Sequence, residues 1–309
     1  MAKKKDKNQS ILYNVHDKFF RENVSRLEVA KDIVKEYLPS KITKQMDLRT
    51  LKINLDSFID KELREHFSDI VYTINISGKK SYVYLLFEHK SYTDIMVSFQ
   101  LLRNMVKIWE NCLKQNSGLK KLPVVLPLIF YHGKVKWRLG NRFSNIVETI
   151  SNTEQYIPDF VSELFDISHL DDRQIKGAIL TQMFFLTLKY IFKPELPQKL
   201  HDIFSLYNKI SKKKNASEYL EILLRYLTGA MNSENNEILQ EKFIQSIENG
   251  ESIMPVIAEK WIEKGIEKGI EKGKIEAIDK MLEEGFDWKM ITKITGINKK
   301  EYERYKKEE

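Results

Sequence analysis

The sequence of 309 residues contains one cysteine, Cys112. A single thiol cannot close an intramolecular disulfide, and it cannot supply a cysteine-based zinc cluster. The residues around Cys112 follow a helical apolar pattern, which indicates a place in the core. A disulfide-stapled scaffold and a cysteine-ligated zinc domain are therefore excluded.

Long hydrophobic runs are also missing. The longest one, within LPVVLPLIFY, has only about half the length that a membrane-spanning helix needs. The lysine-rich start, MAKKKDKNQS, is not followed by the apolar segment of a signal peptide. We expect a cytoplasmic protein without a membrane partner, in which residues 1–12 form a disordered basic tail.

Several common catalytic motifs are absent as well. The sequence has no GxGxxG or Walker loop, its six histidines form no HExxH pattern, and no serine stands in a nucleophile elbow. Lys and Arg number 51 against 44 Asp and Glu, which gives a net charge of +7. This excess has the sign that a nucleic-acid binder needs, but its size does not identify one.

What the sequence does contain is a β-hairpin. Residues 70–76 (IVYTINI) and 82–87 (YVYLLF) are rich in β-branched and aromatic residues. The polar segment 77–81 (SGKKS) separates them and contains the glycine of a turn. We expect two further strands, one at residues 46–55, where apolar and polar residues alternate, and a buried one at residues 123–131, which ends at His132. This histidine could lie near a metal ion or serve the structure alone.

The turn sets which residues meet at the open end of the hairpin. A two-residue loop at Gly78 and Lys79 places Asp69 directly opposite Glu88, and a four-residue loop places it opposite Lys90. Side chains alternate along a strand, so either register brings Asp69 onto the face that Glu88 and Lys90 share. A three-residue loop would put Asp69 on the wrong face. In either favourable register the paired Cβ atoms lie about 5 Å apart.

Two carboxylates at that distance repel each other by about 3 kcal/mol at an effective dielectric constant near 20. Asp69 and Glu88 are hard oxygen ligands of the kind that Mg²⁺ or Mn²⁺ takes, and Lys90 could orient or help deprotonate a water. The alternative is an exposed Glu-Lys ion pair at a strand end. The strand favours a site, because it is apolar on both faces and its end therefore lies at the rim of a buried sheet.

Five segments of the sequence resemble a known family. They are HDKFF at 16–20, ELREHFSDIVY at 62–72, YLLFEHKS at 84–91, LLRNMVKIWE at 101–110 and PLIFYHGKVKW at 127–137. The resemblance is to the transposase-like, recombination-promoting nuclease (Rpn) family, a branch of the PD-(D/E)XK nucleases. It covers residues 13–140 well and the tail more loosely. It implies a metal-dependent DNA endonuclease linked to transposon-like recombination.

The resemblance also implies roles for individual residues. Asp69 matches the motif acid, Glu88 and Lys90 match the Glu-x-Lys pair, and the backbone carbonyl of His89 would be a further metal ligand. The sequence departs from the motif at Ser68, where the pattern has a proline before the acid.

Two helices flank the expected strands. Residues 13–37 have apolar positions at helical spacing, and in the resembling nucleases such an early helix can lend an accessory acid. Asp17 is the candidate, with a helix N-cap as the alternative. Residues 94–114 form an amphipathic pattern whose apolar face we assign to Ile95, Phe99, Leu102, Val106 and Trp109. The opposite face carries Gln100, Arg103, Asn104 and Lys107. Gln100, Arg103 and Lys107 are candidate contacts for DNA phosphates, although a solvated face has the same pattern.

Composition shifts near Gly140, and the remainder is mostly helical. An IEKG repeat over 262–273 places a glycine at every fourth position, which predicts a weak helix or a flexible arm. The last residues resemble a helix-turn-helix whose recognition helix would carry Lys289 and Lys293. The expected divisions are a nuclease-like domain at 13–140, a helical subdomain at 141–258, a linker helix at 259–275 and a helix-turn-helix-like element at 276–309.

The sequence therefore predicts an α/β, restriction-endonuclease-like fold with a mixed sheet flanked by helices and a helical C-terminal region. The expected activity is Mg²⁺- or Mn²⁺-dependent hydrolysis of DNA. The helical remainder would supply DNA contacts or self-association as a homo-oligomer. A second function stays open, namely a non-catalytic DNA-binding or regulatory protein that keeps the fold and binds through its C-terminal helices.

Overall fold

The computed structural model describes residues 7–54, 69–88, 94–231 and 236–308. The chain divides into two compact units, Met1–Glu248 and Asn249–Glu309. The sequence predicts a division near residue 140, whereas the first unit continues through that point and includes the helices that follow.

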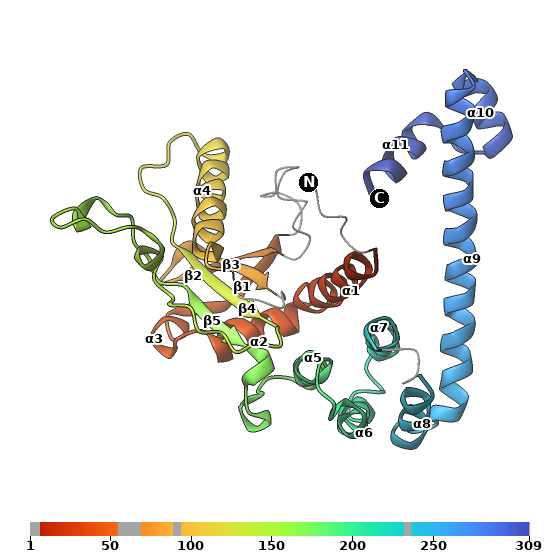
Figure 1. The fold of residues 1–309 in the computed structure, drawn as a ribbon, viewed down its shortest axis with the longest axis horizontal. Coiled ribbons are helices and arrows are strands. Elements are labelled where there is room, and N and C mark those ends of the chain that lie inside the picture. Colours follow the sequence, from red (N-terminus) through yellow and green to blue (C-terminus); the bar gives the residue numbers. More distant parts are fainter. Residues whose placement is uncertain (1–6, 55–68, 89–93, 232–235, 309) are drawn as a thin grey trace. The chain divides into compact units, whose positions relative to one another are not determined.

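A five-stranded sheet in the order β1-β2-β3-β4-β5 forms the centre of the first unit (Figure 1). The strands are β1 (Met46–Asn54), β2 (Ile70–Ile76), β3 (Lys79–Glu88), β4 (Val125–Tyr131) and β5 (Glu163–Asp166). β1, β2 and β3 pair antiparallel, and β3, β4 and β5 pair parallel. The sheet is mixed and flanked by helices, so the predicted α/β class is confirmed.

The turn between β2 and β3 consists of Ser77 and Gly78. Their φ angles are 48° and 76°, as in the two-residue turn that matches the twist of a hairpin. The predicted loop at Gly78 and Lys79 is therefore wrong by one residue. Moving the loop by one residue changes the sum of paired positions by two. Because side chains alternate with a period of two, each side chain stays on the face that was predicted for it.

The register pairs Ile70 with Leu85. Continuing it by one residue sets Asp69 beside Leu86, so the expected pairing of Asp69 directly opposite Glu88 is wrong. The alternation of side chains still places Asp69 and Glu88 on the same face, two positions apart along the strand.

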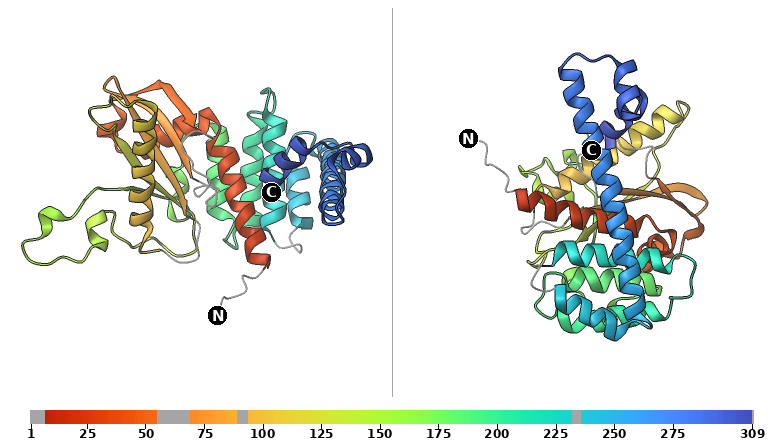
Figure 2. Two further views of the ribbon diagram at one scale, coloured as in Figure 1. Left: turned by 90° about the horizontal axis from the view of Figure 1, so that it is seen from above. Right: turned by 90° about the vertical axis from the view of Figure 1, so that its right-hand side faces the viewer.

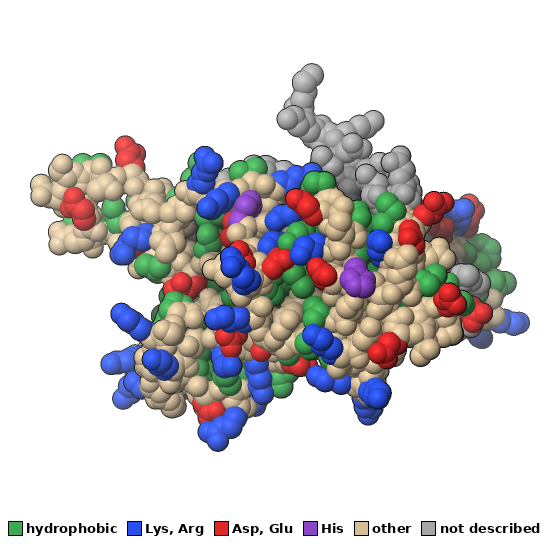
Figure 3. Space-filling model, turned by 90° about the horizontal axis from the view of Figure 1, so that it is seen from below, with side chains coloured by type: hydrophobic (Ala, Val, Ile, Leu, Met, Phe, Trp, Pro, Cys, Tyr) green, Lys and Arg blue, Asp and Glu red, His purple; other side chains and the backbone are tan. Residues whose placement is uncertain are grey.

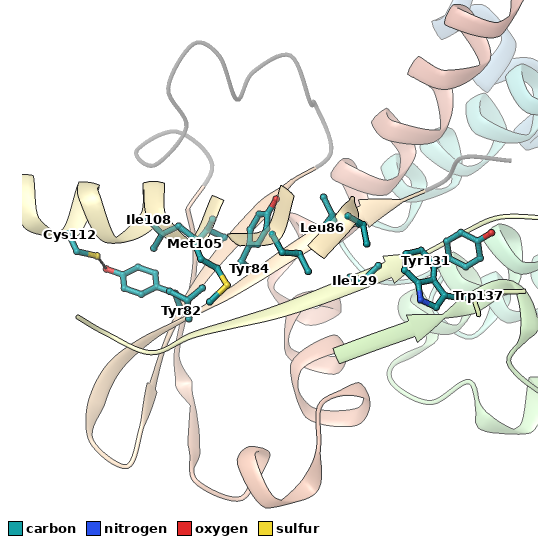
Figure 4. Close-up of a cluster of buried hydrophobic side chains, with 13 residues drawn as sticks. Tyr82, Tyr84, Leu86, Met105, Ile108, Cys112, Ile129, Tyr131 and Trp137 are labelled. Atoms are coloured by element: carbon teal, nitrogen blue, oxygen red, sulfur yellow. Dashed lines mark hydrogen bonds between the residues drawn. The ribbon is translucent and has the colours of Figure 1, made fainter. Parts of the chain in front are cut away.

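Helices cover both faces of the sheet (Figure 2). On one face, α4 (Val97–Gln115) packs against side chains of β3 and β4, as Figure 4 shows for Met105 and Ile108 beside Tyr84. On the other, α1 (Lys7–Val24) lays Phe20 on Phe87, with ring centres 3.9 Å apart. Cys112 is buried on the side of α4 that faces the sheet, as its helical apolar pattern predicted.

The buried stripe of α4 differs from the predicted one. It consists of Val97, Ser98, Leu101, Asn104, Met105, Ile108 and Cys112. Ile95, just before the helix, and Phe99 and Val106 within it, all assigned to the core from the sequence, are 60%, 55% and 42% exposed. The helix has apolar residues on two sides, so periodicity alone did not determine which side meets the sheet. As a result Asn104, expected in solvent, lies inside.

The remaining elements of the first unit are mostly helical. They are α2 (Leu27–Tyr37), α3 (Ser40–Thr43), the 3₁₀ turns η1 (Phe143–Ile146), η2 (Glu154–Tyr156), η3 (Ile167–His169) and η4 (Asp172–Gln174), and the helices α5 (Ile179–Tyr190), α6 (Leu196–Asn208), α7 (Ala216–Ala230) and α8 (Asn236–Ser246). α7 packs on α1, and α5 packs on α2 and α6. The helical region thus shares a core with the elements around the sheet.

The second unit consists of α9 (Gly250–Glu283), α10 (Trp288–Thr295) and α11 (Lys299–Glu308). α9 is one continuous helix through the IEKG repeat, where a weak helix or a flexible arm was predicted. Ile278 and Ile291 lie at the centre of a small core between the end of α9 and the two short helices. Asp287 caps α10 by accepting a hydrogen bond from the Met290 backbone N–H at 2.8 Å.

Within the described ranges, no helix combines the length and the apolar character that crossing a membrane requires. Basic and acidic side chains are interspersed on the face of the molecule that Figure 3 shows. This distribution agrees with the modest net charge of +7.

Candidate functional site

The two predicted carboxylates lie at the same edge of the sheet. Asp69 directly precedes β2, and Glu88 is the last residue of β3. The hairpin folds back on itself, so the start of one strand and the end of the next meet. Both side chains are buried, with 5% and 4% of their surface exposed. Their backbones lie at the ends of strands that are covered on both faces, which fixes the positions of the two side chains.

Hydrogen bonds hold the Asp69 carboxylate in one orientation. The Tyr84 hydroxyl donates to Asp69 Oδ2 at 2.5 Å. The Asn104 side-chain amide donates to the Tyr84 oxygen at 2.5 Å and to Asp69 Oδ2 at 3.3 Å. Tyr84 comes from β3 and Asn104 from α4, so the sheet and its covering helix both position the acid.

The surroundings of Asp69 oppose its ionisation. Burial, together with the negative charges of Asp17 and Glu88, raises the pKa of the Asp69 carboxyl to about 7. The hydrogen bond from Tyr84 and the positive charge of Arg103 act in the opposite direction. Burial, followed by the charge of Asp69, holds the pKa of Tyr84 well above its ordinary value. Tyr84 therefore stays a hydrogen-bond donor across the physiological range.

Asp17 joins this group from α1. It lies in the interior of the helix Lys7–Val24, so the helix-cap alternative for Asp17 is wrong. Its side chain is buried, and its charge acts on the Asp69 carboxyl. Its neighbour His16 bonds through Nδ1 to the Tyr226 hydroxyl at 2.8 Å, which ties this end of α1 to α7.

The structure describes only some of the remaining candidate residues. His89 and Lys90 lie outside the described residues. On α4, Arg103 is exposed and close enough for its charge to act on Asp69. Gln100 and Lys107 are partly buried on the same helix, three residues before and four residues after Arg103.

Among the described positions, no three His, Cys, Asp or Glu side chains form a ready ligand cluster. The chemistry of Asp17, Asp69 and Glu88 nevertheless fits a hard cation. All three are buried carboxylates, and the charges of two of them raise the pKa of the third. A bound Mg²⁺ or Mn²⁺ would compensate this concentration of negative charge.

The side chain and the backbone of His132 make contacts that connect elements of the fold. Its Nε2 donates to the Leu188 carbonyl at 2.8 Å, and its ring stacks on Phe192 with centres 4.7 Å apart. Its backbone N–H donates to the carbonyl of Glu88 at 2.8 Å. His132 thus joins the end of β3 to β4 and to α5.

Tyr84 and Asn104 were not predicted from the sequence as members of the site. The signal for Tyr84 was available, because it lies four residues before Glu88 on the same face of β3. No comparable signal marked Asn104, since its position depends on which side of α4 meets the sheet.

Comparison with known proteins adds the family. Residues 14–218, more than half of the chain, match the model of a family described as "Putative transposase, YhgA-like". The chain belongs to this family. No solved structure gives a significant match to the chain.

Relatives of this YhgA-like chain include proteins named as recombination-promoting nucleases. RpnA of Escherichia coli strain K12 is 36% identical over 118 residues, which cover 38% of this chain and 40% of RpnA. RpnD of Escherichia coli O157:H7 is 26% identical over 250 residues, 79% of this chain and 93% of RpnD. RpnE of strain K12, named an inactive nuclease-like protein, is 32% identical over 126 residues, 41% of this chain and 42% of RpnE. The match thus spans about two fifths of RpnA and RpnE and nearly all of RpnD.

These names associate the YhgA-like family with recombination-related nucleases. Membership alone does not establish activity, because some relatives, among them RpnE, are named inactive.

Proposed function

We propose that this chain is a metal-dependent DNA endonuclease of the PD-(D/E)XK type that hydrolyses phosphodiester bonds in transposase-like recombination. One observation supports this function most directly. Asp69 and Glu88 are buried on the same face at the open end of one hairpin, and the charges of Asp17 and Glu88 both act on Asp69. A structural role explains neither the burial of three acids nor their proximity, since burying like charges together is unfavourable.

In this proposal the side chains of Asp69 and Glu88, with the backbone carbonyl of His89, hold Mg²⁺ or Mn²⁺. The ion, when bound, polarises the phosphate and lowers the pKa of a water. Tyr84 keeps Asp69 fixed through its hydrogen bond to Oδ2. Lys90 orients the attacking water or offsets charge that develops on the phosphate.

Two groups extend the proposed site. Asp17 supplies the accessory acid from α1. Arg103, exposed on α4 and near Asp69, meets a phosphate next to the one that is cut. Gln100 and Lys107 would add contacts along the same helix.

The alternative function is DNA binding without catalysis. The name of RpnE, an inactive nuclease-like protein, favours it, as does the small helical core of the second unit. Lys289 and Lys293 are exposed on α10 and would contact DNA there.

The test is nicking of supercoiled plasmid by the purified full chain in Mg²⁺, Mn²⁺ or a chelator. We expect nicking with either metal, none with the chelator, and loss of at least 100-fold in rate for Glu88→Gln. Glu110→Gln, an exposed change on α4, is the matched control and keeps its rate. Equal rates for Glu88→Gln and the unaltered chain would exclude this site. DNA binding without nicking in any metal would favour the alternative.

A further inference from the structure

A polar groove lies on the sheet at a distance from the carboxylates. It has a volume of about 560 Å³ and opens between β1, the turn end of β2 and β3, and the last residue of α4. Three basic side chains and three amides line it, namely Arg49, Lys52, Lys80, Asn54, Asn75 and Gln115. No Asp or Glu is among its described lining residues.

The floor of this groove belongs to the same face of the sheet as Asp69. Lys52 pairs with Thr73, and Asn75 pairs with Lys80, so these side chains point to one side. Along β2 that side continues from Asn75 through every second residue to Asp69. Six residues of extended chain separate Asn75 from Asp69, a length of roughly 20 Å.

A polar stripe of α4 connects the two places. Asn104, Lys107, Asn111 and Gln115 follow one another at spacings of three or four residues, so they lie along one side of the helix. Asn104 donates to Asp69 at one end of this stripe, and Gln115 lines the groove at the other. The groove and the candidate site therefore lie at the two ends of this stripe and on the same face of β2.

The chemistry of the groove suits a polyanion. Pockets for small organic ligands are mostly apolar, whereas amide and cationic donors line this one. Arg49 pairs with Asp47 at 2.9 Å, so among the described residues the positive charge without an acidic partner comes from Lys52 and Lys80. The Lys80 ammonium lies 5.4 Å from the centre of the Tyr82 ring and so remains close to the floor of the groove.

We propose that this groove binds the phosphate backbone of the DNA whose scissile bond lies at Asp69 and Glu88. The assignment rests on the function proposed above. One strand of B-form DNA carries a phosphate about every 3.4 Å along the helix axis, so 20 Å corresponds to about six phosphates. The groove thus contacts the backbone roughly half a turn from the cut and sets the direction in which the DNA leaves the site.

The test measures binding and cleavage separately. A fluorescent 30-base-pair duplex is titrated with the full chain in Ca²⁺ over a range of salt concentrations, and polarisation gives Kd. The variant Lys52→Gln with Lys80→Gln removes two exposed charges. Lys212→Gln with Lys214→Gln removes the same charge from an exposed segment between α6 and α7 and serves as the control. Circular dichroism checks that both variants fold.

We expect the groove variant to bind roughly 30-fold more weakly at 0.15 M salt and its slope of log K against log salt to fall by about 1.8. The control should stay within twofold of the unaltered chain. An unchanged slope and Kd for the groove variant would overturn the proposal that the groove binds DNA, whether or not the protein cuts DNA. Binding through the groove without cleavage in Mg²⁺ or Mn²⁺ would support the groove as a DNA-binding surface and overturn the proposed endonuclease activity. A full chain that binds no duplex would overturn both.

Discussion

At the scale of single residues, the site combines acids with the groups that restrain them. The position of Asp69 near Glu88 could be predicted from the sequence, because Asp69 opens a strand whose partner ends in Glu88. The hydrogen bonds that restrain Asp69 could not be predicted, since Tyr84 and Asn104 come from two elements whose packing depends on the whole core. The contribution of Lys90 remains a prediction, because that residue lies outside the described positions.

The raised pKa of Asp69 predicts an unusual dependence of stability on pH in the metal-free protein. Its value of about 7 lies above the value in the unfolded chain, so the folded state binds more protons between about pH 4 and 7. The free energy of unfolding contributed by this group is therefore present at low pH and is lost as the pH rises through 7.

The variant Asp69→Asn has no carboxyl to ionise at this position, so it does not lose this free energy of unfolding as the pH rises. In a chelator, we expect the free energy of unfolding of this variant, relative to that of the unaltered chain, to rise by about 2 to 3 kcal/mol from pH 5 to pH 8. Urea unfolding at both pH values measures the gain. Parallel pH profiles for the two proteins would show that Asp69 does not have the raised pKa.

The hydroxyl of Tyr84 is predicted to matter for catalysis beyond its effect on folding. We expect Tyr84→Phe to slow metal-dependent nicking by about 10- to 100-fold, since outer partners that orient a metal ligand have effects of this size. Tyr82→Phe is the matched control, because Tyr82 lies two residues earlier on the same face and contacts Cys112 instead. Similar nicking rates for the two variants would contradict the positioning role.

At the scale of elements, the hairpin shows what the pattern could and could not predict. The β-branched and aromatic runs identified both strands, and side-chain alternation placed the acids on one face. The turn was assigned one residue late because Ser77 adopts a positive φ, which is uncommon outside glycine. β5 was missed because Glu163–Asp166 is short and carries charges at both ends.

The turn gives a prediction for stability. Gly78 has a φ of +76°, and a Cβ there would meet nothing within 4 Å. Gly78→Ala should thus destabilise the fold by about 1 kcal/mol through backbone strain alone. Gly118→Ala, whose Cβ would make one ordinary contact with Asn116, is the control and should lie within about 0.5 kcal/mol of the unaltered chain. Urea midpoints measure both, and equal effects would argue against the assigned turn.

At the scale of the whole molecule, the chain consists of two compact units. The proposed site and groove lie in the first unit, and the helix-turn-helix-like core forms the second. The composition shift near residue 140 did not mark this division, because the helices that follow pack on α1 and α2. A change in composition reports a change in secondary structure, which need not coincide with a break in packing.

This division predicts that catalysis survives removal of the second unit. A chain that ends at Glu248 should remain folded and should nick plasmid within about fivefold of the full rate, because no proposed site residue lies beyond that point. A folded truncated chain that no longer acts on DNA would instead favour binding through α10 and α11.

The central claim is that Asp69 and Glu88 jointly hold a divalent cation, and titration calorimetry with Mn²⁺ tests it most directly. The account predicts saturable binding by the full chain and a loss of at least tenfold in affinity for Asp69→Asn and for Glu88→Gln, with Glu110→Gln unchanged. Mn²⁺ binding that is absent from the full chain, or equal in all four proteins, would contradict it.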